Sequence, residues 1–240
     1  MSGSWHAKQW LIVTVVNKGM ARKVVQASKD AGARGGTVIP GRGTGTREMM
    51  RFLGIPFEAE KEVILTLLSG REVEPVQRAI RETAKLDRPG AGIAFVIRVD
   101  SALGLVPEPS AETAERPVEV RETVEGNQGY ELIVTIVSQG DAETVVEASR
   151  KAGAGGGTIL TGRGTGIHEK MKLFGIPIEP EKEIVLTLVT REQSAAVMEA
   201  IVAAAQLKEP GKGISFVLPV ERVFGINHDL HQEMRAKFSK

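Results

Sequence analysis

The residues best suited to chemistry in this sequence are glycines that alternate with other residues around an arginine. They are Gly41, Arg42, Gly43, Thr44 and Gly45, preceded by Gly35, Gly36 and Thr37. Glycines at alternate positions let consecutive backbone N–H groups turn toward one point, which makes a concave nest that binds anions, most often phosphate. The arginine adds a permanent charge and a fork of donors. The pattern indicates a phosphate cradle, or, as the alternative, glycines that serve only turns and a bulge at a strand end.

A second glycine pattern precedes the last predicted strand in each half of the chain. The first half has Gly90 and Gly92 around Ala91, and the second half has Gly211, Lys212 and Gly213. A Gly-x-Gly turn can present amides to a phosphate, and a lysine inside it could neutralise the phosphate as a mobile charge. The alternative is a plain tight turn with a solvated lysine. The first glycine segment is not a Walker loop, because no Lys-Ser/Thr pair follows its glycines, and it is not a dinucleotide fingerprint, because no helix begins directly after it.

The first glycine segment belongs to a unit that is written twice, at a constant offset of 121 positions. It returns as Gly162, Arg163, Gly164, Thr165 and Gly166, preceded by Gly156, Gly157 and Thr158. We divide the chain into a domain at 9–105 (copy one), an acidic, proline-containing linker at 106–129, a domain at 130–226 (copy two) and a C-terminal tail at 227–240. Residues 1–105 carry a net charge of +6 and residues 130–226 a net charge of −2. The copies are therefore electrostatically unlike.

In each copy, segments with the apolar spacing of a strand and segments with that of a helix follow one another in the same order. In copy one, strand patterns cover 10–16, 36–39, 63–68 and 93–99, and helical patterns cover 21–31 and 76–86. The order β-α-β-β-α-β is that of the ferredoxin-like architecture, so the predicted fold class is α+β with two tandem ferredoxin-like domains. Because the strands are apolar on the face that carries no helices, we expect another subunit or domain to cover that face.

The composition of the 240 residues excludes several classes of site and partner. The chain has no cysteine, so it has no disulfide, no thiolate nucleophile and no cysteine-held metal. A net charge of +1 does not favour binding to nucleic acid or to an anionic membrane. No apolar stretch is long enough for a spanning helix, and we expect a protein of the reducing cytoplasm.

The other titratable residues give weaker signals. We predict a solvated role, not metal ligation, for the histidines His6, His168, His228 and His231. The Glu-Lys-Glu runs at 60–62 and 181–183 are interpreted as solvated strand edges with internal charge pairing. Two long loops, 46–60 and 167–181, have the length of functional loops, and Phe174 and Ile176 could either dock on a partner or fold back onto the core.

Together these pieces resemble the P-II type nitrogen-regulatory signalling proteins. The resemblance rests on Ala-Gly-Ala-x-Gly-Gly-Thr leading to Gly-Arg-Gly, on the Glu-Lys-Glu strand that follows the long loop, and most specifically on residues 211–223. It implies a ferredoxin-like domain that assembles as a trimer and binds adenine nucleotides in clefts between subunits. It also implies that the long loop moves to control a target enzyme or a membrane transporter.

The resemblance implies roles for individual residues. It places Gly162 and Gly164 at the base of the family's T-loop, beside the nucleotide phosphates. It places Gly211 and Gly213 on the phosphate-binding B-loop. It places Gly156, Gly157 and Thr158 in the wall of the adenine pocket, which a neighbouring subunit supplies.

The sequence also departs from the family pattern. Ile214 stands where the B-loop of the family ends in a lysine, and Gly225 and Asn227 replace its C-terminal basic pair. The shortened T-loop has no tyrosine, because the only tyrosine of the chain is Tyr130. These departures weaken the case for tight triphosphate and 2-oxoglutarate binding and favour a P-II-like sensor over a standard P-II regulator.

The sequence therefore predicts a cytoplasmic tandem P-II-like regulator that has no catalysis of its own and requires no cofactor. The expected effector is an adenine nucleotide (ATP, ADP or AMP), and the expected partner is a target enzyme or a membrane transporter, which could bring the chain to a membrane. We expect three chains that present six domains. The alternatives are a divalent-metal-binding trimeric protein of the same architecture, a nucleotide-cleaving enzyme that uses Glu169 or Glu181 as base, and a purely structural trimer.

Overall fold

A computed structural model describes residues 9–44, 59–99, 129–164, 172–173, 176–177 and 180–225. Copy one contains β1 (Gln9–Asn17), α1 (Ala21–Asp30), β2 (Thr37–Gly43), β3 (Ala59–Ser69), the 3-10 turn η1 (Gly70–Glu72), α2 (Val73–Ala84) and β4 (Gly92–Val99). Copy two contains β5 (Tyr130–Ser138), α3 (Ala142–Lys151), β6 (Thr158–Arg163), β9 (Glu181–Thr190), α4 (Arg191–Ala204), β10 (Gly213–Val220) and β11 (Arg222–Phe224). A short pair, β7 (Lys172–Leu173) and β8 (Ile176–Pro177), lies within the second long loop. The predicted α+β class and the β-α-β-β-α-β order of each copy are confirmed.

Local sequence explains where these elements begin and end. Helix α1 ends before Gly32, which adopts a φ of +112° that residues with a side chain rarely adopt. Ser69 and Glu72 form a capping box before α2, and the Ser69 amide donates to the Glu72 carboxylate at 2.8 Å. At the start of β4, a Cβ on Gly92 would lie 2.3 Å from the carbonyl oxygen of Val15, so only glycine fits there.

The strands of both copies form one sheet in the order β10-β5-β9-β6-β2-β3-β1-β4-β11. The copies join where β2 pairs antiparallel with β6, with Gly41 opposite Leu160 and Gly43 opposite Thr158. We call this β2–β6 junction the seam. Strand β2 was predicted to end at Ile39 but continues to Gly43, because it finds partners on both sides, β3 and β6.

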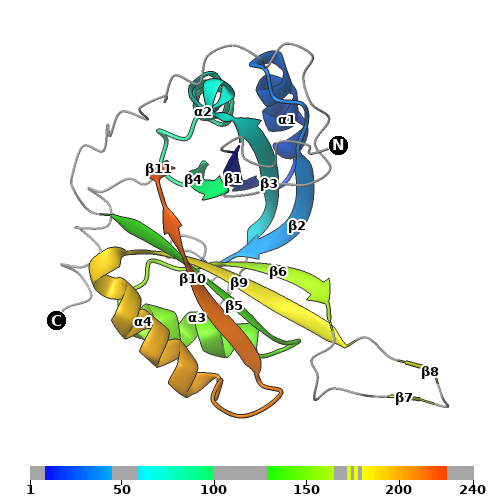
Figure 1. Cartoon of the computed structure of the whole chain (residues 1–240), viewed down its shortest axis with the longest axis vertical. Helices are drawn as coiled ribbons and strands as arrows, with labels where there is room; N and C mark the ends of the chain where they lie inside the picture. The colour runs from blue at the N-terminus through cyan, green and yellow to red at the C-terminus, as the bar shows by residue number, and fades with distance from the viewer. Residues whose placement is uncertain are drawn as a thin grey trace, which may run out of the picture.

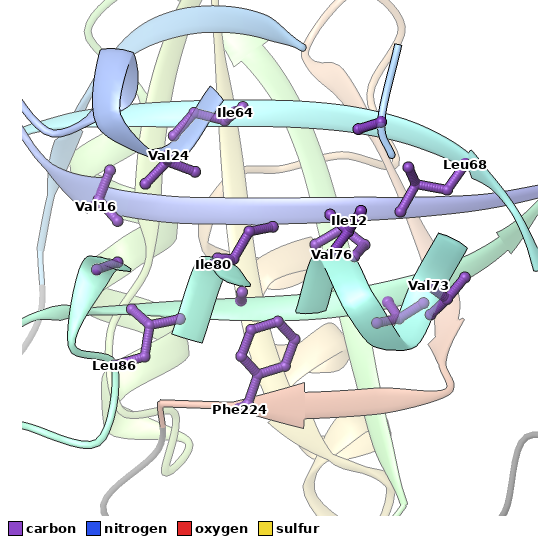
Figure 2. Close-up of a cluster of buried hydrophobic side chains, with 14 of the residues drawn as sticks. Ile12, Val16, Val24, Ile64, Leu68, Val73, Val76, Ile80, Leu86 and Phe224 are labelled. Carbon is purple, nitrogen blue, oxygen red and sulfur yellow. The ribbon is translucent and has the colours of Figure 1, made fainter. Parts of the chain in front are cut away.

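Three apolar clusters hold the molecule together. One cluster lies between the sheet and helices α1 and α2, and its side chains are drawn in Figure 2. A second cluster lies between the sheet and helices α3 and α4. The third joins the helix-free faces of the two copies, with Val13, Val63 and Phe95 from copy one and Leu132 and Val134 from copy two. The expectation that another domain covers the helix-free face is thus confirmed, and the covering domain is the other copy.

The layers can be followed in Figure 1, where the helices of each copy lie on the side away from the other copy. Strand β11, coloured red, leaves copy two and crosses to copy one. There it pairs with β4, so that Phe224 lies opposite Ala94. The Phe224 ring, only 8% exposed, packs into the copy-one core beside Ile80 and Leu86. The sequence analysis did not predict this strand.

Within the described residues, no helix is both long and apolar enough to cross a membrane.

Candidate functional site

The first glycine segment lies at the seam. Gly41 pairs with Lys61 of β3 on one side and with Leu160 of β6 on the other. A Cβ on Gly41 would lie 2.8 Å from the Leu160 side chain and 3.0 Å from the carbonyl oxygen of Ile159, so this glycine allows the close approach of the copies. At this position the glycine therefore serves strand pairing between copies.

Thr44 continues the seam beyond the end of β2. Its amide and its hydroxyl both donate to the carbonyl oxygen of Gly157, at 2.9 and 2.8 Å, and the Gly157 amide lies 2.9 Å from the same hydroxyl oxygen. Thr158 begins β6 and pairs with Gly43. The structure therefore brings together two sets of predicted residues, the copy-one glycine segment and the Gly157–Thr158 wall of copy two.

Arg42 carries the charged contact of the seam. Its Nη2 lies 2.6 Å from Oε1 of Glu183, and its Nη1 lies 3.5 Å from Oε1 of Glu143. The Glu183 side chain is only 5% exposed, and its Oε2 also accepts hydrogen bonds from the amides of Gly140 and Ala142 at the start of α3. The guanidinium that was predicted to hold phosphate therefore holds the two copies together.

The two Gly-x-Gly turns have the geometry of tight turns. Gly90 and Gly211 adopt φ values of +80° and +85°, and nothing lies within 4 Å of the Cβ position at Gly211. Gly213 matches Gly92, because its Cβ would lie 2.3 Å from the carbonyl oxygen of Ile136. Lys212 is exposed, and its backbone amide donates to the carbonyl oxygen of Glu209 at 3.3 Å.

A lysine that the sequence analysis missed links the glycine segment to the turn. Lys61, opposite Gly41 in the sheet, is only 7% exposed, and its Nζ donates to Oδ1 of Asn17 at 2.8 Å. The Asn17 amide group in turn donates to the carbonyl oxygen of Gly90 at 3.3 Å. The two glycine patterns therefore lie at the same end of the copy-one sheet, with a buried ammonium group between them.

Copy two repeats this row of residues. Gly213 pairs with Val137, the next residue, Ser138, pairs with Lys182, and Lys182 pairs with Gly162. Lys182 donates to the Ser138 hydroxyl at 3.3 Å. The interpretation of the Glu-Lys-Glu runs as solvated strand edges is wrong for Lys61 and Glu183, which are both buried. Lys61 lies on the sheet face that is turned toward the other copy. Glu183 accepts hydrogen bonds from the amides at the start of α3 and pairs with Arg42.

The second glycine segment differs from the first in what surrounds it. Gly162 and Arg163 pair with β9, but their other edge meets no strand among the described residues. The Gly164 amide donates to the carbonyl oxygen of Pro180 at 3.2 Å. Arg163 is exposed and forms no ion pair with any residue that the structure describes. Copy two thus presents the predicted arginine to solvent.

The remaining predicted residues lie at the start of β2 or just before β2 and β6. Gly35, Gly36 and Gly156 lie just before the strands β2 and β6, and Thr37 begins β2. At Gly36, a Cβ would meet the Ile64 side chain at 3.1 Å, so this glycine packs closely on β3. Outside the described residues lie Gly45, Thr165, Gly166, Glu169, Phe174, Asn227, the four histidines, most of both long loops, and the linker and tail; of Ile176 only the backbone is described.

Two further observations concern electrostatics. Burial raises the pKa of the Tyr130 phenol above its ordinary value of 10.0, and the nearby Glu192 carboxylate raises it further. Among the residues described, no group of three or more histidine, aspartate or glutamate side chains is arranged to hold a metal ion.

Comparison with known proteins follows the two copies. The family model for the nitrogen regulatory protein P-II matches residues 10–107 and again residues 130–229. Among solved structures, the crystal structure of the Arabidopsis thaliana PII protein bound to citrate is 25% identical over 40% of this chain and 78% of that chain, with a TM-score of 0.31. No curated protein matches the chain significantly.

Proposed function

The chain belongs to the P-II nitrogen regulatory protein family, and from this premise we propose that it is a signalling protein whose effector is a small phosphate-bearing molecule, an adenine nucleotide. The effector binds where domains meet, and it controls a target enzyme or a membrane transporter through the loops 46–60 and 167–181. The protein acts in the cytoplasm, catalyses no reaction itself, and assembles as three chains with six domains.

The observation that carries the proposal is the row of groups at one end of each sheet. In copy two, Gly162 lies opposite Lys182 and Lys182 opposite Ser138, while Gly213 pairs with Val137, the neighbour of Ser138; Arg163 and Lys212 are adjacent in the sequence to Gly162 and Gly213. Backbone amides, a fork of guanidinium donors and two ammonium groups are the groups that bind phosphate oxygens. The row spans three strand spacings, roughly 14 Å, which is a distance that a nucleotide with its phosphates can bridge.

Copy two is the better receptor of the two. In copy one, the backbone of Gly41 to Gly43 has strands on both sides, and Arg42 is held by Glu183. In copy two the outer edge of the segment is unpaired in the described residues, and Arg163 is exposed. We therefore propose Gly162, Arg163 and Gly164 with Gly211, Lys212 and Gly213 as the main effector contacts, and Gly35, Gly36, Thr37, Gly41, Arg42, Gly43, Thr44, Gly45, Gly90, Gly92, Gly156, Gly157, Thr158, Thr165 and Gly166 as residues of the equivalent and adjoining positions.

An effector regulates a partner only if it binds two states of the protein with different affinity. The T-loop base at Gly164 leads directly into the loop 167–181. A phosphate bound at Gly164 would favour the loop conformations in which the Gly164 amide and the Arg163 side chain can donate hydrogen bonds to it. The partner would then bind more tightly, or less tightly, to the loop conformation that the effector selects.

Calorimetric titration with AMP, ADP, ATP and a cyclic dinucleotide tests the proposal. At least one of these nucleotides should bind, and Arg163→Ala should weaken its binding by about 1.5 to 3 kcal/mol, the range for a hydrogen bond to a charged group. Arg71→Ala is the matched control, since Arg71 is exposed in η1 at the opposite end of its sheet. Flat titrations with all four nucleotides would reject the proposal, and steady phosphate release from a bound nucleotide would favour an enzyme instead.

A further inference from the structure

In copy two, a pocket at the start of α3 holds the guanidinium group of an arginine. Oε2 of Glu183 accepts hydrogen bonds from the amides of Gly140 and Ala142, and its Oε1 lies 2.6 Å from Nη2 of Arg42. Arg42 lies opposite Ile159 in the seam, and Ile159 is only 1% exposed. The pocket therefore combines a carboxylate that is fixed by the start of a helix with an apolar residue opposite the arginine.

Copy one has the equivalent carboxylate, Glu62, at the start of α1. Its Oε2 accepts hydrogen bonds from the amides of Gly19 and Ala21, at 3.0 and 2.7 Å. Among the residues that the structure describes, none donates a hydrogen bond to its Oε1, the oxygen that in Glu183 pairs with Arg42. One carboxylate oxygen of Glu62 is thus positioned to receive a cation.

A hollow lies beside this carboxylate. It has a volume of about 360 Å³ and is lined by Gly19, Arg22, Lys23 and Glu62. Pockets for small molecules have volumes of about 300 to 1,000 Å³. Val38, the counterpart of Ile159, is 43% exposed and is a diagonal neighbour of Glu62 on the same face of the β2–β3 pair. An apolar surface therefore lies within reach of a ligand that is bound at Glu62.

Two cations distinguish this hollow from the pocket of copy two. Arg22 stands at the position of Glu143, which in copy two lies 3.5 Å from Arg42, and Lys23 stands at the position of Thr144. Arg22 and Lys23 are exposed, and neither forms an ion pair within the part of the chain that the structure describes. The hollow therefore suits a small molecule that carries a cation at one end and an anion at the other.

We propose that this hollow is a binding site for free arginine. The guanidinium fork binds Oε1 of Glu62, and the methylene chain packs on Val38. The carboxylate of the ligand binds Arg22 and Lys23. Guanidinium and carboxylate groups match each other with parallel, charge-assisted hydrogen bonds, so both ends of the ligand find a partner of opposite charge.

The charges favour a free amino acid over an arginine side chain of a second protein. An arginine inside a polypeptide has no carboxylate of its own, so it brings a cation to Glu62 while Arg22 and Lys23 stay without an anion. Like charges placed together at a contact disfavour binding. No residue of the hollow belongs to the proposed nucleotide site, so the two ligands occupy separate sites of the chain.

Calorimetric titration of the full chain with L-arginine tests the proposal. L-arginine should bind at one site per chain. Citrulline, which has a neutral urea group in place of the guanidinium, should bind more weakly by about tenfold or more, because it loses one charge-assisted contact. Agmatine, which has the guanidinium but no carboxylate, should also bind more weakly by about tenfold or more, for the same reason at the other end.

Two charge changes assign the two ends of the site. Glu62→Gln keeps an oxygen for the helix amides and removes the charge, so it should weaken arginine binding by about tenfold or more. Arg22→Glu introduces the residue of copy two, and it should weaken the binding of L-arginine but strengthen that of agmatine. Opposite responses of two ligands cannot come from a general loss of folding. Lys29→Glu, the same change in charge at the far end of α1, should leave both affinities unchanged.

The outcomes separate this site from the proposed nucleotide site. A flat titration with L-arginine overturns the arginine site, whatever the nucleotides do. Arginine binding that Glu62→Gln leaves unchanged also overturns it, and agmatine that binds as tightly as L-arginine overturns the role of Arg22 and Lys23. If L-arginine binds as expected while all nucleotide titrations are flat, the arginine site is supported and the nucleotide proposal is rejected.

Discussion

The two copies have the same order of elements and matching sequences, yet equivalent residues have opposite environments. Ile159 and Phe95 are buried, while their counterparts Val38 and Phe216 are exposed. Ile159 belongs to the core between the sheet and helices α3 and α4, and Phe95 belongs to the cluster that joins the two copies, so the burial of equivalent residues depends on what packs against them. Side-chain type alone does not determine it. The comparison also separates two arginines, since Arg42 pairs with Glu183 and Glu143 while Arg163 is exposed and forms no ion pair with any residue that the structure describes.

The largest test of this comparison replaces the two phenylalanines. Phe224→Ala removes a ring from the closed core of copy one, and we expect the free energy of unfolding to fall by about 3 to 4 kcal/mol. Phe216→Ala removes a ring that is already 40% exposed, and we expect a loss below about 1 kcal/mol. Urea denaturation measures both. Equal losses would show that β11 adds nothing to the copy-one core.

A smaller effect is expected from the two glutamates at the helix starts. Glu183→Gln keeps an oxygen that accepts the amides of α3 but removes the charge that holds Arg42, and we expect a loss of about 2 kcal/mol. Glu62→Gln keeps the equivalent acceptor for α1 and has no described arginine partner to lose, so its loss should stay near 0.5 kcal/mol, as for a changed helix cap.

The difference between the two glutamate variants measures the Arg42 contact, because the helix starts are matched. In an Arg42→Ala background the difference should vanish. If the difference between the two variants persists in that background, its cause lies in the contact of Glu183 with α3 and not in the seam.

The smallest effect concerns pH and Tyr130, whose counterpart in copy one is Gln9. Burial, and to a lesser extent Glu192, raises the phenol pKa above 10.0 in the folded protein. The stability that Tyr130 contributes is therefore complete below about pH 10 and is lost as the pH rises through the folded-state pKa. Urea denaturation at about pH 8 and about pH 11 should show a steeper fall for the wild type than for Tyr130→Phe. Parallel curves would show that the phenol does not titrate differently on folding.

The sequence was sufficient for the fold of each copy because strand and helix periods differ. Ile12 and Val16 face the helices, while Val13 and Val15 face the other copy. Because both faces of this strand are covered, its sequence is a continuous apolar run. The need for a cover on the helix-free face followed from the same residues. The order of elements therefore required no information from distant parts of the chain.

The seam could not be predicted, because it is made largely of backbone pairing between residues far apart in the sequence. Nothing in the local sequence of Gly41 indicates that Leu160 lies against it. Glu183 was interpreted as solvated because its burial comes from α3 and from Arg42, which is 141 positions away. The candidate site was located by its glycines, but which arginine stays available depends on the seam.

The position of Phe224 has a consequence for how the chain is made on the ribosome. Copy one is synthesised first, but the ring that completes its core is one of the last parts of copy two to be translated. Throughout most of translation, the nascent amino-terminal half therefore has an open slot between α2 and β4. Copy one can complete its core only after β11 has been translated. Premature termination before residue 222 would therefore release a product whose copy-one core lacks Phe224, a defect that protein quality control can recognise.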